Sequence, residues 1–172
     1  MTSEIVESIS IKVKYLDASA MVKLYLLDEP GSKDFRDYFN SHINYCTTRM
    51  TFYETMNVLK RRLFNKNTKD KYFQSVEDLA IHGWGGKIEI ESIELDNLNI
   101  FKEVSKISMD YNLDMADSIQ IYSILKGKYR YLIKESSSIL ITADDNLELA
   151  AKTNGIRVWN CRKNAKPAWL DN

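Results

Sequence analysis

The sequence predicts an α/β fold: one domain with a central, mainly parallel sheet of four to five strands flanked by helices. Short apolar runs rich in β-branched and aromatic residues alternate with longer stretches in which apolar residues recur every three or four positions. Alternating strands and helices favour parallel strand pairing. The length of 172 residues suits a single domain, so we expect one unit over residues 1–172.

Each element can be placed by its residue pattern. The expected strands are 11–16, 43–47, 87–93, 138–142 and 156–160. The expected helices are 18–27, 31–40, 49–64, 68–81, 96–110, 115–126 and 145–153. Gly127 favours the end of the sixth helix. Residues 65–71 and 82–86 are expected turns, and 162–172 has no clear period, so we expect a loosely packed tail.

The charge balance excludes a uniformly basic, nucleic-acid-binding surface. The chain carries 24 Lys and Arg residues and 24 Asp and Glu residues, so its formal net charge is zero. A nucleic-acid partner would therefore have to be held by a local patch.

The apolar runs and the cysteines bear on the cellular compartment. Cys46 and Cys161 each lie in or beside a strand-like run, so we expect buried thiols rather than a disulfide. No apolar run approaches the roughly 18 residues of a membrane span. The first residues, M-T-S-E-I-V-E-S, lack the pattern of a signal peptide. We therefore expect a cytoplasmic protein with no membrane partner.

Acidic residues follow two of the expected strands. Asp17 ends the run K-Y-L, and Asp144 and Asp145 follow I-L-I-T. Ligands bind beyond the carboxyl ends of strands in open parallel sheets, so neighbouring strands would bring these carboxylates into one cleft. Clustered carboxylates repel unless a cation neutralises them, and Mg²⁺ or Mn²⁺ suits an all-oxygen site. The alternative is that Asp17, and Asp144 or Asp145, cap helices.

Two further acids lie in expected helices. Glu54 shares a surface with Asn57 in T-F-Y-E-T-M-N-V-L, a pattern that a solvated helical face would also show. Asp117 precedes the apolar run S-I-Q-I-Y-S-I-L, and Asp114 is a candidate N-cap for the same helix. An acid in a first helical turn gains roughly 0.3–1 kcal/mol from the helix dipole, so Asp117 also has a purely structural alternative.

Four stretches, in order, resemble the PIN-domain nucleases, and most closely the VapC-like toxins of toxin–antitoxin pairs. They are Y-L-D-A-S-A-M-V-K-L, F-Y-E-T-M-N-V-L, L-D-M-A-D-S-I-Q-I-Y-S and I-T-A-D-D-N-L-E-L-A-A-K-T-N-G-I-R-V. Together they extend from residue 15 to about residue 158. The chain departs from a compact toxin of this type by extra length around 65–87 and after Trp159.

The resemblance implies a PIN-like fold and a set of site residues. It makes Asp17, Glu54, Asp117 and Asp144 the catalytic acids and metal ligands, with Asp145 and Asp114 as further candidate ligands. The implied supporting residues are Ser19, Asn57 and Thr142. Candidate RNA contacts from the basic positions are Lys23, Arg49, Lys60, Arg61 and Arg62, with 126–130 as a second patch.

The implied activity is that of an Mg²⁺- or Mn²⁺-dependent endoribonuclease that hydrolyses phosphodiester bonds in single-stranded or looped RNA. The resemblance also implies a toxin role, a small antitoxin partner and a homodimer. An open alternative is a non-catalytic PIN-like module that binds RNA or protein. A receiver domain is disfavoured because it lacks an acid like Glu54 inside a helix, and because the lysine it would carry after a late strand has no convincing equivalent here. A D-x-D phosphatase is disfavoured because the first strand ends in D-A-S.

Overall fold

The computed structural model describes residues 11–64, 68–132 and 134–171, and it confirms the α/β fold with a parallel sheet. Five strands form one sheet in the order β3-β2-β1-β4-β5, and every neighbouring pair is parallel. The strands are β1 (Lys14–Leu16), β2 (Tyr45–Thr48), β3 (Ile88–Glu91), β4 (Ile139–Thr142) and β5 (Arg157–Asn160). Each falls within or overlaps an expected strand.

Seven α-helices occur within the described residues; six are close to the expected ranges, whereas the helix expected over 18–27 is shorter, an α-helix over 18–21 followed by a 3₁₀ turn. The seven are α1 (Ala18–Met21), α2 (Ser32–Ser41), α3 (Arg49–Leu59), α4 (Lys69–Trp84), α5 (Leu98–Tyr111), α6 (Met115–Lys126) and α7 (Asp145–Thr153). A π-helical turn continues α3 over Lys60–Phe64, and short 3₁₀ turns cover Val22–Leu24, Lys134–Ser136 and Ala168–Leu170. Residues 65–67 of the expected turn at 65–71 lie outside the described residues.

Helix α4 extends beyond the expected end at Ile81. Gly83 lies within the helix because α4 packs closely there: a Cβ at this position would come within 2.9 Å of Ile90 and 3.2 Å of Phe52. The expected turn over 82–86 therefore begins only at Gly85. Close packing, which is not visible in the local pattern, outweighs the low helix propensity of glycine.

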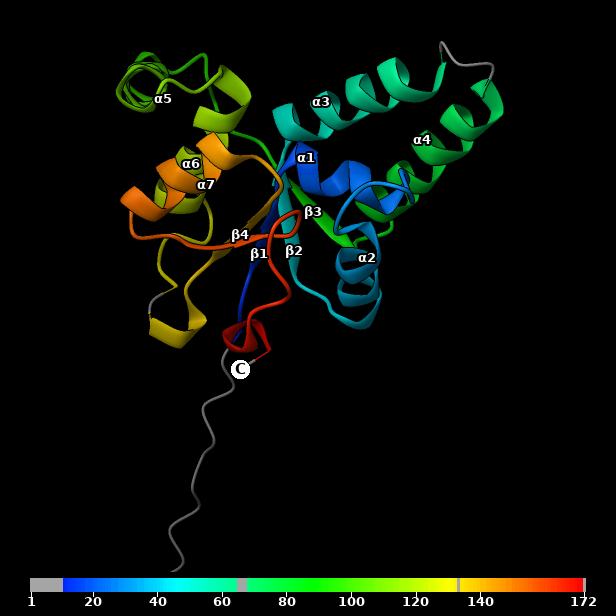
Figure 1. Cartoon of the computed structure of the whole chain (residues 1–172). Coiled ribbons are helices and arrows are strands. Elements are labelled where there is room, and N and C mark those ends of the chain that lie inside the picture. The colour runs from blue at the N-terminus through cyan, green and yellow to red at the C-terminus, as the bar shows by residue number, and fades with distance from the viewer. Residues whose placement is uncertain (1–10, 65–67, 133, 172) are drawn as a thin grey trace, which may run out of the picture.

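The two faces of the sheet are both buried, as a parallel sheet requires. In Figure 1 the strands stand between α5, α6 and α7 on one side and α1 to α4 on the other. Alternation along each strand sends side chains to opposite faces. Tyr15, Cys46 and Leu140 pack against α6 and α7, whereas Leu16, Tyr45 and Ile141 pack against α1 and α2. Cys46 and Cys161 are buried free thiols, as expected.

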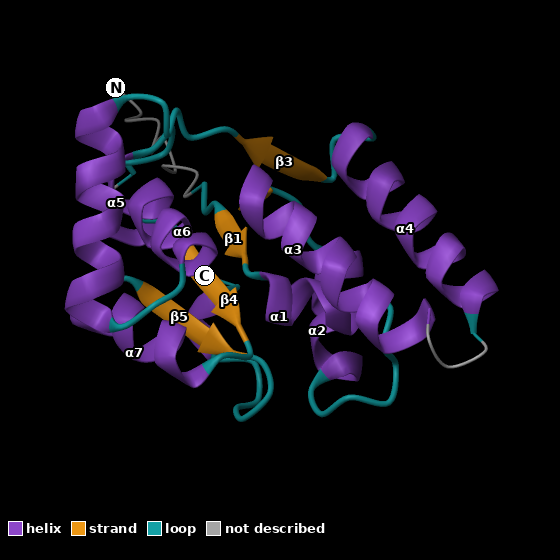
Figure 2. Cartoon of the chain, turned by 90° about the horizontal axis from the view of Figure 1, so that it is seen from above, coloured by secondary structure: helices purple, strands orange, loops and turns teal. Residues whose placement is uncertain are grey.

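Helices α3 and α4 form a hairpin with its own small core. Phe52 and Leu59 of α3 and Leu79 of α4 are buried together with Val22. Figure 2, viewed from above, shows the distal ends of the two helices reaching well beyond α1 and the sheet. Within the described ranges, no helix has both the length and the apolar character needed to cross a membrane.

One residue of the expected loosely packed tail, Leu170, packs against the core, whereas most of residues 162–169 are exposed. Leu170 is 2% exposed and belongs to the cluster that contains Trp159 and Tyr38. The Trp159 indole donates a hydrogen bond to the carbonyl of Asn164 (3.0 Å). Gly31, at φ +79°, lies so close beneath the tail that a Cβ there would be 1.8 Å from the Cys161 carbonyl oxygen. The tail covers a core aromatic ring, which a periodicity argument cannot detect.

Leu170→Ala should lower the free energy of unfolding by about 2–5 kcal/mol, because it removes a buried side chain and leaves a cavity. Chemical denaturation of the purified chain measures this change. Leu149→Ala is the matched control: Leu149 is 67% exposed, and its removal should cost less than about 0.5 kcal/mol. Equal costs for the two variants would contradict the packing of the tail.

Candidate active site

The first and fourth strands bring two acids to the same edge of the sheet. Asp17 follows β1 and Asp144 follows β4, and these strands are direct neighbours, with Leu16 paired to Ile141. The amide of Asp17 donates to the carbonyl of Ile141 (3.1 Å). Strand order reverses at β1, with β2 on one side and β4 on the other. The acids therefore lie at the topological switch point, where open α/β sheets bind ligands.

Asp17 is a buried carboxylate held by four donors. It is 3% exposed and accepts hydrogen bonds from the amides of Ala18 (2.6 Å) and Ser19 (3.1 Å), from the Thr142 hydroxyl (2.9 Å) and from the Ser19 hydroxyl. Burial raises the pKa of Asp17, and the hydrogen bonds from Ser19 and Thr142 oppose that rise. The carboxyl group is thus fixed in position.

Ser19 and Thr142 also connect Asp17 to the start of α7. The Thr142 hydroxyl accepts from the amide of Asp144 (2.9 Å), and the Ser19 hydroxyl accepts from the amide of Ala143 (2.8 Å). Oδ1 of Asp144 caps α7 by accepting from the amides of Asn146 (2.7 Å) and Leu147 (2.9 Å). Asp144 therefore caps α7 and also lies beside Asp17 at the carboxyl ends of the strands.

Glu54 and Asp117 come from two helices that touch through a polar contact. The Thr51 hydroxyl of α3 donates to the Gln120 side-chain oxygen of α6 (2.9 Å). Glu54 and Asp117 each lie one helical turn from that contact. The contact fixes the distance between the two helices, and with it the separation of their acids.

The acids repel one another across this edge. Burial, followed by the negative charges of Asp17 and Asp114, raises the pKa of Glu54 to about 7, and Arg61 opposes the rise. Burial and the charges of Asp17, Asp114, Glu54 and Asp144 raise the pKa of Asp117 to about 8. Asp114, which caps α6 through the Asp117 amide (2.9 Å), thus belongs to the same group. We name the five residues Asp17, Glu54, Asp114, Asp117 and Asp144 the acidic edge.

The acidic edge has the donor chemistry for a hydrated divalent cation. Oε2 of Glu54 is buried and has no hydrogen-bond partner in the part of the chain that the structure describes. Such an atom is costly to bury unless something pairs with it. Across the same described residues, no three Asp, Glu, His or Cys side chains form a ready-made set of metal ligands. The residues fit an ion that keeps several waters and contacts one or two carboxylates, as Mg²⁺ does.

Asp145, a further candidate ligand, lies outside the acidic edge. Its carboxylate is exposed and contacts Lys163 (2.7 Å), Arg162 (2.7 Å) and the side-chain amide nitrogen of Asn160 (3.1 Å). The hydrogen bonds from Lys163 and Arg162 lower the pKa of Asp145. The adjacent acids Asp144 and Asp145 therefore have different surroundings, which their sequence could not distinguish.

Lys23 does not lie where an RNA contact requires. It is 2% exposed, and its ammonium group donates to the carbonyl of Pro30 (2.8 Å) and to Glu29 (3.3 Å). Its position corrects the expectation that it contacts RNA: the charge holds the turn before α2. Arg49, Lys60, Arg61 and Asn57, by contrast, are exposed along α3 and its continuation.

Gln120 is a polar component of the site that the sequence analysis passed over. It is fully buried, and its side-chain nitrogen has no hydrogen-bond partner among the described residues. A glutamine within the apolar run S-I-Q-I-Y was the signal that could have identified it. Its side-chain oxygen accepts the hydrogen bond from Thr51 that joins the helices carrying Glu54 and Asp117.

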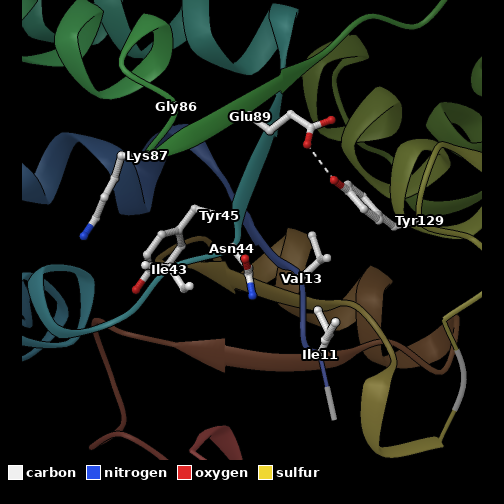
Figure 3. A pocket seen from close by; sticks show the side chains of 9 residues that line it. All are labelled: Ile11, Val13, Ile43, Asn44, Tyr45, Gly86, Lys87, Glu89 and Tyr129. Carbon is white, nitrogen blue, oxygen red and sulfur yellow. Dashed lines mark hydrogen bonds between the residues drawn. The ribbon is translucent and has the colours of Figure 1, made fainter. Parts of the chain in front are cut away.

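A cavity of about 380 Å³ lies at the opposite edge of the sheet, near the amino ends of β1, β2 and β3. Figure 3 shows its lining, which includes Val13, Tyr45, Lys87 and Glu89. Its carboxylate, Glu89, already accepts from Lys128 (2.6 Å) and from the Tyr129 hydroxyl (2.5 Å). Among the described residues that line the cavity, Glu89 is the one carboxylate, and it is already paired, so the acidic edge is the stronger candidate.

The chain belongs to the PIN domain family, whose model matches residues 14–153. This is a nuclease-type domain, so nucleic acid is the class of substrate that the family implies. The crystal structure of PAE2754 from Pyrobaculum aerophilum is similar, with a TM-score of 0.56 and 17% identity over 92% of each chain. That likeness bears on the fold alone. No curated protein sequence matches the chain.

In the absence of divalent cations, the free energy of unfolding should fall as the pH rises. The folded state binds protons more tightly than the unfolded state when the pKa of an acid is raised. Stability should therefore be lost between pH 4.5 and about 7 for Glu54, and between pH 3.8 and about 8 for Asp117. Urea unfolding at a series of pH values in EDTA measures this.

Glu54→Gln should flatten that decline and make the variant more stable than the wild type above pH 8 or so. Glu103→Gln, an exposed acid on α5 paired with Lys126, should leave the pH dependence unchanged. A wild-type slope in the Glu54 variant would contradict the electrostatic account of the acidic edge.

Proposed function

We propose that this protein is a divalent-metal-dependent endoribonuclease, and that it is the toxin of a type II toxin–antitoxin system. The observation that carries the catalytic proposal is the acidic edge itself. Five carboxylates from separate parts of the chain repel one another, and Oε2 of Glu54 is buried without a partner. A bound cation would reduce the repulsion between the carboxylates and would pair with the buried oxygen of Glu54.

Asp17, Glu54, Asp117 and Asp144 are the residues that would hold Mg²⁺ or Mn²⁺, directly or through water, with Asp114 beside them. The ion would acidify a water molecule and stabilise charge on the scissile phosphate. Asp17 contributes a fixed carboxylate, because four hydrogen bonds hold it. Ser19 and Thr142 hold Asp17 and the start of α7 in register, so that the acids keep their spacing.

Single-stranded or looped RNA is the proposed substrate, because its backbone and bases are accessible there. Arg49, Lys60 and Arg61 are exposed on the helix that carries Glu54, and they would contact phosphates. Arg61 lies close enough to Glu54 to affect its pKa. A chain of zero net charge would use such a local cluster rather than its whole surface.

The toxin role, the antitoxin partner, the homodimer and the cytoplasmic location rest on the resemblance to VapC-like toxins. An antitoxin segment that enters the acidic edge would carry a basic side chain, since five carboxylates favour a cation. A non-catalytic PIN-like module is the alternative function. It would bind RNA or protein with the same surface but would show no metal-dependent turnover.

Asp17→Asn and Asp117→Asn should each reduce metal-dependent RNA cleavage by more than about 100-fold, because each removes a charge that would hold the ion. The measurement is cleavage of a panel of single-stranded and hairpin RNAs in Mg²⁺ or Mn²⁺ and in EDTA. At Asp17, which caps α1, asparagine keeps one of the two accepting oxygens; Asp117 caps no helix, so its substitution tests the charge without removing a cap.

Asp110→Asn is the matched control, since Asp110 is exposed on α5 and pairs with Lys106. It should leave cleavage unchanged. If wild-type protein with normal folding cleaves no RNA in either metal, the binding-module alternative becomes the better account. Cleavage that survives both acid substitutions would indicate a contaminating nuclease.

A further inference from the structure

Three aromatic side chains meet at the distal end of the α3–α4 hairpin. The Phe64 ring lies 5.5 Å from the Tyr72 ring and 6.3 Å from the Phe73 ring, centroid to centroid, in edge-to-face arrangements. Tyr72 and Phe73 are 5.4 Å apart. We name Phe64, Tyr72 and Phe73 the aromatic tip. Their mutual packing holds each ring in place, as edge-to-face contacts do.

The aromatic tip is only partly buried. Phe73 is 60% exposed, whereas Phe64 and Tyr72 are half-buried. Because Phe64 and Tyr72 support it, Phe73 presents a large apolar surface to solvent in an ordered position. An exposed and ordered aromatic ring can bind another flat ring at little cost in conformational entropy.

Basic residues flank the aromatic tip in the sequence, although Asp70 and Glu77 each lie one helical turn from Phe73 on α4. Residues 60–64 and 68–71 contain Lys60, Arg61, Arg62, Lys69 and Lys71 but only one acid, Asp70. The ammonium groups of Lys69 and Lys60 lie 5.1 Å and 6.0 Å from the centre of the Phe64 ring. Arg62 pairs with Glu29 (2.5 Å), so its charge is already engaged. This concentration of positive charge stands out in a chain with zero net charge.

The aromatic tip is connected to the acidic edge along one helix. Glu54 and Asn57 lie three residues apart on one face of α3, and the π-helical turn over Lys60–Phe64 continues the same helix to Phe64. Phe64 lies ten residues beyond Glu54, a length of at most about 15 Å at 1.5 Å per residue, because the π-helical turn rises less per residue than an α-helix. That length corresponds to no more than about four stacked nucleotides at roughly 3.4 Å each.

We propose that the aromatic tip is a binding platform for an unpaired base of single-stranded RNA, with Lys60 and Lys69 contacting the adjacent phosphates. Aromatic rings beside cations are the common means of binding single strands, since every base has a face that can stack. The stacked base lies no more than about four nucleotides from the phosphodiester bond cleaved at the acidic edge. This placement relative to the cleaved bond rests on the proposed function, whereas RNA binding at the tip does not.

A second exposed aromatic residue on the same helix also packs edge-to-face against another ring, Phe52 (5.5 Å), but it lacks the basic neighbours. Trp84, at the other end of α4, is 75% exposed, and its neighbours on the surface include Glu77, Ala80 and Ile81. Trp84 is more exposed than Phe73, and no lysine or arginine is among the described residues that line its surface with it. A substitution at Trp84 therefore serves as a control that distinguishes base stacking at a basic surface from nonspecific hydrophobic binding.

The test is binding of a fluorescent single-stranded RNA to the full chain in the Asp117→Asn background, so that the RNA stays intact. Phe73→Ala should weaken binding by roughly 5- to 150-fold, the range for loss of one stacked base. Phe73→Leu should weaken it similarly, because leucine keeps the apolar volume without the ring. Lys69→Ala should weaken binding and reduce its salt dependence by about one charge. Trp84→Ala should bind as the parent does.

Unchanged binding in both Phe73 variants would overturn the inference, as would an equal loss in Trp84→Ala. Tight binding of blunt double-stranded RNA that depends equally on Phe73 would also overturn it, since stacked pairs offer no free base. If the Phe73 variants lose RNA binding but the wild-type chain cleaves nothing, the platform is supported and the proposed catalysis fails. If the wild type cleaves RNA and the Phe73 variants bind normally, the nuclease stands and the platform fails.

Discussion

The buried carboxylate of Asp17 is the constraint on which the rest of this structure depends. It follows the central strand β1, caps α1 and accepts hydrogen bonds from the hydroxyls of Ser19 and Thr142. Through Thr142 it fixes the start of α7, and through its charge it raises the pKa of Glu54 and Asp117. A fold that buries this group must satisfy it with donors, and a fold that surrounds it with acids must tolerate repulsion or bind a cation.

Helix capping and cation binding are compatible roles for the same carboxylates. Asp144 and Asp114 cap α7 and α6 with Oδ1 and still belong to the acidic edge. Helix N-termini carry partial positive charge, so they stabilise acids that would otherwise repel one another strongly. The caps thus help the protein to hold several carboxylates at one edge before any ion arrives. The alternatives weighed from the sequence, cap or ligand, need not exclude each other.

Much of the fold could be predicted from periodicity, whereas the surroundings of individual side chains could not. Strand alternation and helical spacing predicted the positions of all five strands and the approximate ranges of the seven described helices, because burial imposes those periods. The bonds of Asp145 to Arg162 and Lys163, and the burial of Lys23 against Pro30, depend on distant or looped segments. The burial of Leu170 could not be predicted either, because the sequence around it has no strand or helix periodicity. Asp114 was expected to be a cap or a further ligand, and its electrostatic coupling to Glu54 could not be predicted because it requires the α3–α6 contact.

The measurement that tests the central claim most directly is calorimetric titration of the chain with Mn²⁺ at pH 7, in buffers of different ionisation enthalpy. Because the pKa of Glu54 is about 7 and that of Asp117 about 8, both acids are partly protonated without a cation. Metal ligands must be deprotonated, so binding should release about one proton and should be lost in Asp17→Asn. Absence of binding, or equal binding and proton release by wild type and Asp17→Asn, would contradict the assignment of the acidic edge as a cation site.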